Sequence, residues 1–381
     1  MKTDHNIQLI AALFLLPVAV CAQTFDSGSD GSYGPLNVTS NTVLDLPPDG
    51  IFRCTTITVT NGRTLSFRRN PLNTPVYLLA TGDVTISGVI DVRGKDGLLG
   101  VRGEGGPGGF DGGWPANGPG FLPGDGLGPG RGIGSNNGDT GFGAYGLTTS
   151  GNPKNGQAYG NTLIVPLVGG SGGGGGFSSG QYYGGGGGGG AVLVASDTRV
   201  VINSGSTITA QGGIANHSGI GSGGAIRIVA PIVSGSGSLE ARSASGHTVF
   251  GIGRIRIDAT NRFGLSLAVS SAYSIGKYMH VFPLLPSRLD IIQAAGTNIA
   301  EGASMPVRVQ LPEGALTNQV VTVQARDFIG VVPITVEVTP DSAPSIRYNT
   351  AIDMAGGNLA QTNVPVVIPA GTSCRIYAWT R

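Results

Sequence analysis

Runs of glycine constrain this chain more than any other feature of its sequence. Seven glycines follow one another from Gly184 to Gly190, five from Gly172 to Gly176, and 40 of the 97 residues from Gly94 to Gly190 are glycine. A stretch without side chains has high chain entropy and few groups to offset its loss. The whole chain holds 68 glycines in 381 residues, which excludes a compact helical protein, and the absence of a Gly-X-Y period excludes collagen.

Aromatic residues nevertheless occur along the glycine-rich stretch: Phe110, Trp114, Phe121, Phe142, Tyr145, Tyr159, Phe177, Tyr182 and Tyr183. A pure linker would not need them. We therefore expect residues 94–190 to form an inserted lobe of irregular, partly mobile loops that lies against the rest of the fold. Trp114, Tyr182 and Tyr183 are the candidate ligand-binding residues, because an aromatic ring can stack on a sugar. The alternative is that these rings only pin the loops in place.

An internal repeat underlies the rest of the N-terminal region. Val38 to Leu46, Val59 to Phe67 and Ile202 to Ala210 align without gaps. The aligned corner residues are Asn41, Gly62 and Gly205, and looser copies place Gly88 and Gly237 at the same corner. Glycine and asparagine are the residues that most readily accept positive φ, and the flanking apolar residues alternate as in a strand.

The spacing of the repeat predicts a stacked fold. The distance is 21 residues from Leu44 to Leu65, 25 from Leu65 to Ile90, and 31 from Ile208 to Leu239. Such periods are typical of solenoids, and three short strands per period predict a parallel β-helix. We place it at residues 23–270, interrupted by the insertion at 94–190.

A change of composition near residue 286 indicates a second domain. Glycine becomes sparse, and five segments are rich in strand-forming residues: Val307 to Leu311, Gln319 to Ala325, Pro333 to Thr339, Val364 to Ile368 and Cys374 to Thr380. We expect residues 286–381 to form an immunoglobulin-like β-sandwich. The junction should lie between Arg262 and Leu285.

The first residues read as an export signal. Lys2 precedes an apolar run that ends at Val20-Cys21-Ala22, so residues 1–22 are predicted to be a signal peptide cleaved before Gln23. Lipoprotein processing at Cys21 is the alternative. No later stretch is long and apolar enough to be a membrane helix. The two remaining cysteines, Cys54 and Cys374, could form a disulfide in an oxidising compartment or stay as free thiols.

Three short motifs carry a resemblance to a known group of proteins. Gly82 to Gly88, Gly223 to Ile228 and Gly253 to Ile257 resemble segments of glycine-rich exported bacterial proteins. The predicted fold of those proteins is similar to the pectin-lyase-like right-handed β-helix. The resemblance covers roughly residues 30 to 270, and it implies a right-handed β-helix and an exported location rather than an activity.

Catalytic and metal-binding patterns are weak in this sequence. A lyase-like site would need acidic calcium ligands, for which Asp83, Asp91 and Asp96 are the nearest candidates, and Asp83 and Asp91 could project from one wall of the β-helix. We favour the alternative that these residues are solvated turn carboxylates. Arg254 and Arg256 share one face of a strand and read as a surface pair. The histidines, His217, His247 and His280, are scattered. We therefore predict no catalytic residue, no metal site and no cofactor.

The sequence favours an exported structural or adhesin-like protein, located at the cell surface or secreted, without catalytic activity. The alternatives are a polysaccharide-active lyase or hydrolase and a carbohydrate-binding module. Extracellular polysaccharide or cell-surface components are the expected partners. A formal net charge of +1 argues against nucleic acid.

Overall fold

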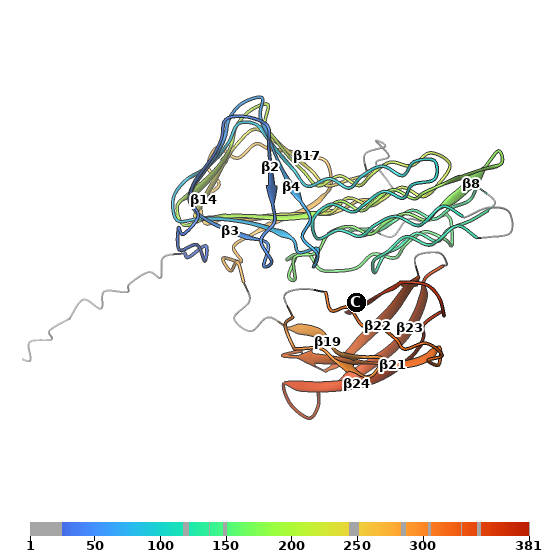
Figure 1. Cartoon of the computed structure of the whole chain (residues 1–381). Coiled ribbons are helices and arrows are strands. Elements are labelled where there is room, and N and C mark those ends of the chain that lie inside the picture. The colour runs from blue at the N-terminus through green and yellow to red at the C-terminus, as the bar shows by residue number, and fades with distance from the viewer. Residues whose placement is uncertain are drawn as a thin grey trace, which may run out of the picture.

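The computed structural model describes residues 25–116, 122–136, 138–147, 151–243, 251–282, 287–303, 306–328, 330–340 and 344–380. These residues form strands and connecting segments without a helix, so the described chain is all-β. None of it forms a helix that could cross a membrane. Figure 1 shows curled parallel sheets, a long lobe that extends from them, and a C-terminal part that lies beside the lobe. The predicted signal peptide, residues 1–22, falls outside the described residues.

Two parallel sheets enclose the N-terminal core. The larger sheet contains β1 (Gly34–Val38), β3 (Ile51–Val59), β5 (Val76–Ala80), β6 (Val84–Ile86), β10 (Ala191–Ser196), β11 (Arg199–Ile202), β13 (Ala225–Val229), β14 (Ile232–Gly235), β16 (Arg254–Asp258) and β18 (Ala272–Gly276). The smaller sheet contains β2 (Thr42–Asp45), β4 (Thr64–Arg68), β7 (Val89–Asp91), β12 (Thr207–Thr209), β15 (Ser238–Glu240) and β17 (Ala268–Val269).

Three-strand units repeat along this part of the chain. β5, β6 and β7 pair in parallel with β10, β11 and β12, which in turn pair with β13, β14 and β15. β3 occupies the positions of two successive strands of the next unit, because Ile51–Cys54 pair with β5 and Ile57–Val59 pair with β6. The large curled parallel sheet is compatible with a β-helix-like fold.

The repeat places equivalent apolar residues on top of one another inside the sheets. Leu65 pairs with Ile90, Ile90 with Ile208, and Ile208 with Leu239, and all four are fully buried. Each side chain of this size contributes about 1.5–3 kcal/mol when it is buried. The predicted alignment fails in the first unit, where Leu44 pairs with Phe67 rather than with Leu65.

The corner residues fall into two groups. Gly62 and Gly205 have φ angles of 70° and 78°, as predicted, and a side chain there would meet nothing within 4 Å. Gly88, Gly237 and Asn41 are not at positive φ, so the prediction is wrong for them. A Cβ on Gly88 would instead lie 2.2 Å from the carbonyl oxygen of Arg63, so close packing requires that glycine.

The glycine-rich lobe is held together by backbone hydrogen bonds between extended segments. Successive N–H groups of Gly184 to Gly190 donate in turn to three different neighbouring segments, and the pattern repeats every third residue. The donor–acceptor pairs are Gly185–Gly113 and Gly188–Phe110, Gly186–Gly219 and Gly189–Ser222, and Gly187–Lys95 and Gly190–Val92. Three residues per turn without internal bonds is the geometry of a polyproline II helix.

Carbonyl groups of the same run accept from further segments. The oxygen of Gly185 accepts from Gly103, that of Gly186 from Gly173, and that of Gly187 from Gly213. A Cβ placed on any residue from Gly184 to Gly190 would lie 2.0 to 2.6 Å from a backbone oxygen. Every position of the run must therefore be glycine, because neighbouring backbones approach it from all sides.

This network corrects our expectation of irregular loops. Between residues 94 and 190 the described chain has only two strands, β8 (Gly176–Ser178) and β9 (Gln181–Tyr183). Many N–H and C=O groups of the remaining segments bond to one another, and we call these hydrogen-bonded segments the glycine bundle. The bonds offset part of the entropy lost when the segments become ordered.

Two antiparallel sheets form the C-terminal part around their own core. One contains β19 (Arg288–Ala294), β20 (Thr297–Asn298), β21 (Asn318–Arg326) and β24 (Leu359–Val367), and the other contains β22 (Val331–Pro340), β23 (Ile346–Asp353) and β25 (Cys374–Thr380). Both sheets contribute to one apolar cluster that includes Val321, Val336 and Val364. Four of the five predicted strands are present, but Val307 to Leu311 forms none.

Candidate functional site

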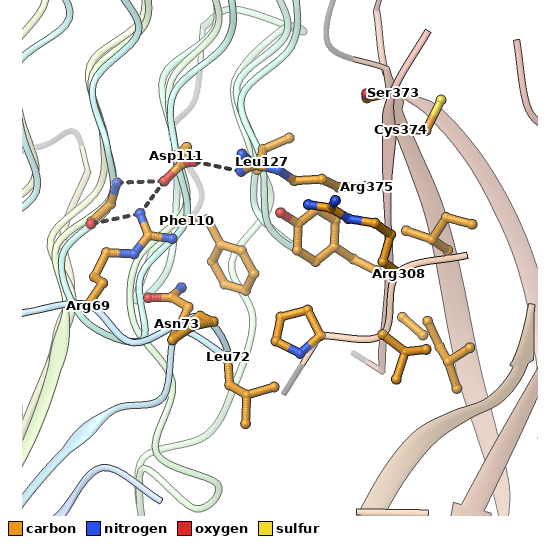
Figure 2. A pocket seen from close by; sticks show the side chains of 18 of the residues that line it. Arg69, Leu72, Asn73, Phe110, Asp111, Leu127, Arg308, Ser373, Cys374 and Arg375 are labelled. Atoms are coloured by element: carbon orange, nitrogen blue, oxygen red, sulfur yellow. Dashed lines mark hydrogen bonds and ion pairs between the residues drawn. The ribbon is translucent and has the colours of Figure 1, made fainter. Parts of the chain in front are cut away.

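A cleft of about 2360 Å³ lies between the N-terminal part and the C-terminal sheets. Figure 2 shows Arg69, Asn73 and Phe110 on one side of it and Arg308 and Arg375 on the other. The ring of Phe110 also packs edge-on against Trp379 of β25, with the ring centroids 6.3 Å apart. The cleft therefore combines guanidinium groups with apolar and aromatic surface.

Asp111 is the electrostatic centre of the lobe side of this cleft. Its carboxylate accepts a hydrogen bond from Arg69 and lies 3.1 Å from Arg102 Nη2 and 4.0 Å from Arg375 Nη1. The N–H of Gly105 donates to it at 2.9 Å. Only 5% of the Asp111 side chain is exposed. The glycine bundle thus holds one buried carboxylate among three arginines, two from the N-terminal part and one from β25.

The balance of these contacts determines the protonation of Asp111. Burial by itself raises the pKa of a carboxyl group, but the guanidinium groups of Arg69 and Arg102 outweigh it, and the pKa of Asp111 lies below its ordinary value. Desolvation lowers the pKa of Arg102. Asp111 is therefore ionised at neutral pH and cannot serve as a proton donor.

A second buried carboxylate lies where the lobe meets the C-terminal sheets. Glu337 of β22 is fully buried and lies 2.7 Å from Arg347 Nε and 3.4 Å from Arg131 Nη1. Arg347 also donates a 2.6 Å hydrogen bond to the carbonyl of Gly128 in the lobe. Arg131 in turn pairs with Asp125 at 3.0 Å. These contacts join the two parts of the molecule.

The third buried carboxylate, Asp258, lies on the outer face of the parallel sheet. Arg256 donates to it at 2.6 Å and Arg227 lies 3.7 Å away. The N–H of Tyr278 donates to it at 2.8 Å. Asp111, Asp258 and Glu337 are the only buried acidic side chains among the described residues, and each is paired with arginines.

This pattern limits the chemistry available to the described residues. Glycoside hydrolysis uses two carboxyl groups on either side of the scissile bond. Each buried carboxylate here is neutralised by arginines rather than placed beside a second carboxylate. The described residues also contain no group of three or more His, Cys, Asp or Glu side chains that could hold a metal ion.

The three acidic residues that the sequence suggested as calcium ligands do not form one site. Asp83 precedes β6 and pairs with Arg199 at 3.0 Å, whereas Asp91 ends β7 and binds its neighbour Arg93. These two strands belong to different sheets, so the expectation that both carboxylates project from one wall is wrong. Asp96 accepts a backbone hydrogen bond from Ile214.

The arginine pair on β16 is not a surface pair. Arg254 donates to the carbonyl oxygen of Tyr159 at 2.9 Å, and Arg256 is 8% exposed. The lobe covers this face of the sheet, which sequence spacing alone did not indicate. His217 and His280 stack separately on Tyr183 and Tyr278, and His247 lies outside the described residues.

The three aromatic candidates occupy separate environments. The guanidinium of Arg102 lies 4.2 Å from the centre of the Trp114 ring. Tyr182 stacks on Phe177 at 4.8 Å across the β8–β9 hairpin, and Tyr183 stacks on His217 at 5.1 Å. Trp114 thus borders the Asp111 cluster, whereas Tyr182 and Tyr183 belong to the hairpin.

Sequence reasoning did not identify the residues that join the two parts. Glu337 and Arg347 face each other across β22 and β23, but their partners in the lobe, Arg131 and Gly128, lie about 200 residues earlier in the sequence and follow no motif. The only signal was their charge: nine of the 97 residues from Gly94 to Gly190 are charged, and Asp111 and Arg131 are two of these. No disulfide joins Cys54 and Cys374, and burial raises the pKa of Cys54 to about 11.

No protein-family model matches the chain, and neither a curated protein nor a solved structure does.

Proposed function

We propose that this chain is an exported protein with a structural or adhesin-like role at the cell surface or in the extracellular matrix, and that it has no catalytic activity. The observation that carries the proposal is the pairing of each buried acidic side chain with arginines. Asp111, Asp258 and Glu337 each lie beside arginines rather than beside a second carboxylate, so they do not form a pair for acid–base chemistry.

The architecture of the lobe supports a presenting role. A bundle whose backbone groups bond to several neighbours is stiff, and Figure 1 places β8 at its far end from the curled sheets. The β8–β9 hairpin bears Tyr182 and Tyr183, which we propose contact sugar rings of extracellular polysaccharide. Trp114 is a further candidate, on the cleft side of the lobe.

The finer fold assignment is part of the same proposal. The three-strand units and their parallel pairing support a right-handed β-helix over residues 23–270. Two antiparallel sheets of four and three strands support an immunoglobulin-like sandwich over residues 286–381. Residues 1–22 would then direct export and be removed.

Two assays on the purified mature protein test the proposal. Incubation with pectin, polygalacturonate, alginate and xylan, with and without calcium, should release neither reducing ends nor unsaturated products. Pull-down with insoluble forms of the same glycans should retain the protein.

Matched variants locate the binding surface. Tyr182→Ala and Tyr183→Ala should weaken retention, whereas Tyr273→Ala should not, because that exposed tyrosine belongs to β18 of the curled sheet. Product formation that follows the protein through purification would refute the non-catalytic role. Retention unaffected by either hairpin variant would refute this surface.

A further inference from the structure

A second cavity, of about 350 Å³, lies on the outer face of the larger parallel sheet. Most of its lining is apolar or aromatic and includes Tyr77, Ile164, Leu193, Val281, Phe282 and Phe328. Its volume lies at the lower end of the range for small-molecule sites, which are mostly apolar with a few placed polar groups.

One guanidinium group lines this apolar cavity. Tyr77, Leu193, Arg227 and Arg256 form a row across β5, β10, β13 and β16, since each pairs with the next in register. Arg227 is only 1% exposed. A charge buried to this degree is costly unless its hydrogen-bonding groups are satisfied.

Backbone carbonyl groups accept hydrogen bonds from three of the five N–H donors of Arg227. Its Nη2 donates to the carbonyl of His280 at 2.6 Å and to that of Tyr278 at 3.3 Å, and its Nη1 donates to Val281 O at 3.4 Å. Among the described residues its Nε has no hydrogen-bond partner. A buried donor without an acceptor is unfavourable, because the hydrogen bond that it made with water is lost and not replaced.

The charges around the cavity do not cancel. Arg227 and Arg256 share the single carboxylate of Asp258, which leaves one positive charge in excess. The other titratable side chains beside Arg227 are Tyr77 and Tyr278, and burial raises the pKa of Tyr77 to about 12, so Tyr77 is neutral at physiological pH. One bound anionic group would balance the cluster.

We propose that this cavity binds a small monocarboxylate with an apolar body, whose carboxylate accepts a hydrogen bond from Arg227 Nε. The apolar part of the ligand lies against Leu193, Ile164 and Phe282. Ile164 has a φ angle of 55°, which is rare for a β-branched residue, and such strained positions cluster at ligand sites.

Isothermal titration of the mature protein with octanoate tests the proposal. Octanol and octylamine share the same apolar chain and differ only in the head group. Octanoate should bind at least tenfold more tightly than octanol, and octylamine should not bind. Absence of octanoate binding, or equal affinity for octanol, would overturn the proposal.

Two variants assign the binding to this cavity. Arg227→Met should abolish the preference for octanoate, whereas Arg199→Met should behave as wild type, because that side chain is 54% exposed and lies outside the lining. Arg227 also holds the segment from Tyr278 to Val281, so Arg227→Met is informative only if it folds. Leu193→Phe fills the cavity and leaves the arginine in place, and it should reduce octanoate binding at least tenfold. Unchanged octanoate affinity in Leu193→Phe would place the ligand elsewhere and refute the proposal.

Discussion

Glu337 and Arg131 lie 3.4 Å apart across the boundary between the C-terminal sheets and the glycine-rich lobe. The carboxylate is fully buried, and the arginine side chain is 15% exposed. Arg347 completes the contact, since it binds both Glu337 and the carbonyl of Gly128. A buried ion pair of this kind fixes the relative position of the two parts, because separating them would leave charges without partners.

Glu337→Gln should destabilise the protein strongly. The substitution removes the negative charge of the fully buried Glu337 side chain, which lies between Arg131 and Arg347. Removing one partner of a buried ion pair costs about 3–5 kcal/mol. Urea unfolding should show the loss. The exposed Glu313→Gln serves as the control and should leave the free energy of unfolding within about 0.5 kcal/mol of wild type. Equal stability of the two variants would contradict the role assigned to Glu337.

Gly62 should tolerate Asn far better than Val. Its φ of 70° is reached readily by Asn but makes a β-branched residue an outlier, so Gly62→Val should cost about 1–3 kcal/mol. Open space surrounds the position, so conformation rather than a clash decides the effect. Thermal melts of both variants provide the measurement, and identical melting temperatures would show that the corner conformation is not required.

Local patterns predicted the parallel units but not the glycine bundle. Leu65, Ile90, Ile208 and Leu239 pair as their spacing indicates, because alternation and turn residues act within one unit. The bundle instead depends on which backbones approach Gly184 to Gly190, and those neighbours come from six other segments of the chain. The sequence of the glycine run does not indicate which segments these are.

The contacts of the candidate site could not be predicted from the sequence for a related reason. Asp111 meets Arg375 only because β25 lies against the lobe, and the two residues are 264 positions apart in the sequence. The sequence shows that a charged residue lies in a glycine-rich stretch, but it does not show which residue is its partner. The aromatic candidates Trp114, Tyr182 and Tyr183 were visible as residue types, while their separation into two environments required coordinates.

Stability should depend on the ionisation of Asp111. Its pKa in the folded protein lies below the ordinary value of 3.8, so its contribution is complete above that value and is lost as the pH falls toward the folded pKa. Asp111→Asn removes this contribution. The difference in unfolding free energy between wild type and the variant should be largest at neutral pH and shrink below about pH 4. A constant difference from pH 7 to pH 2 would disprove the assignment.

The C-terminal part should fold when expressed alone. Residues 286–381 hold a core of their own, including Val321, Val336 and Val364, and their strands pair only with one another. The fragment loses Arg131 as a partner of Glu337, so it should be less stable than the same part in the full chain. A β-type circular dichroism spectrum with a cooperative melt is the expected result. A disordered fragment would show that the lobe is required for folding.

Gly188→Ala should disrupt the bundle although alanine is the smallest side chain. A Cβ at this position would lie 2.0 Å from the carbonyl oxygen of Gly170, which cannot retreat without breaking its own contacts. The N–H of Gly188 also donates to Phe110 O at 2.7 Å, so movement of the run disturbs the segment next to Asp111. Overpacking costs about 1–3 kcal/mol in a side-chain core, and a clash between backbones should reach the upper end of that range.

Gly356→Ala is the matched control for this substitution. Gly356 has no atom within 4 Å of its added Cβ and does not have a positive φ, so the same change should leave stability within about 0.5 kcal/mol of wild type. Amide hydrogen exchange adds a local readout: in Gly188→Ala, protection should fall in Gly184 to Gly190 and in the segments around Phe110 and Gly219, and it should persist in the core strands β10 and β13. If Gly188→Ala retained full protection in the lobe, the run would not be enclosed on all sides and the hydrogen-bonded bundle would be the wrong description of it.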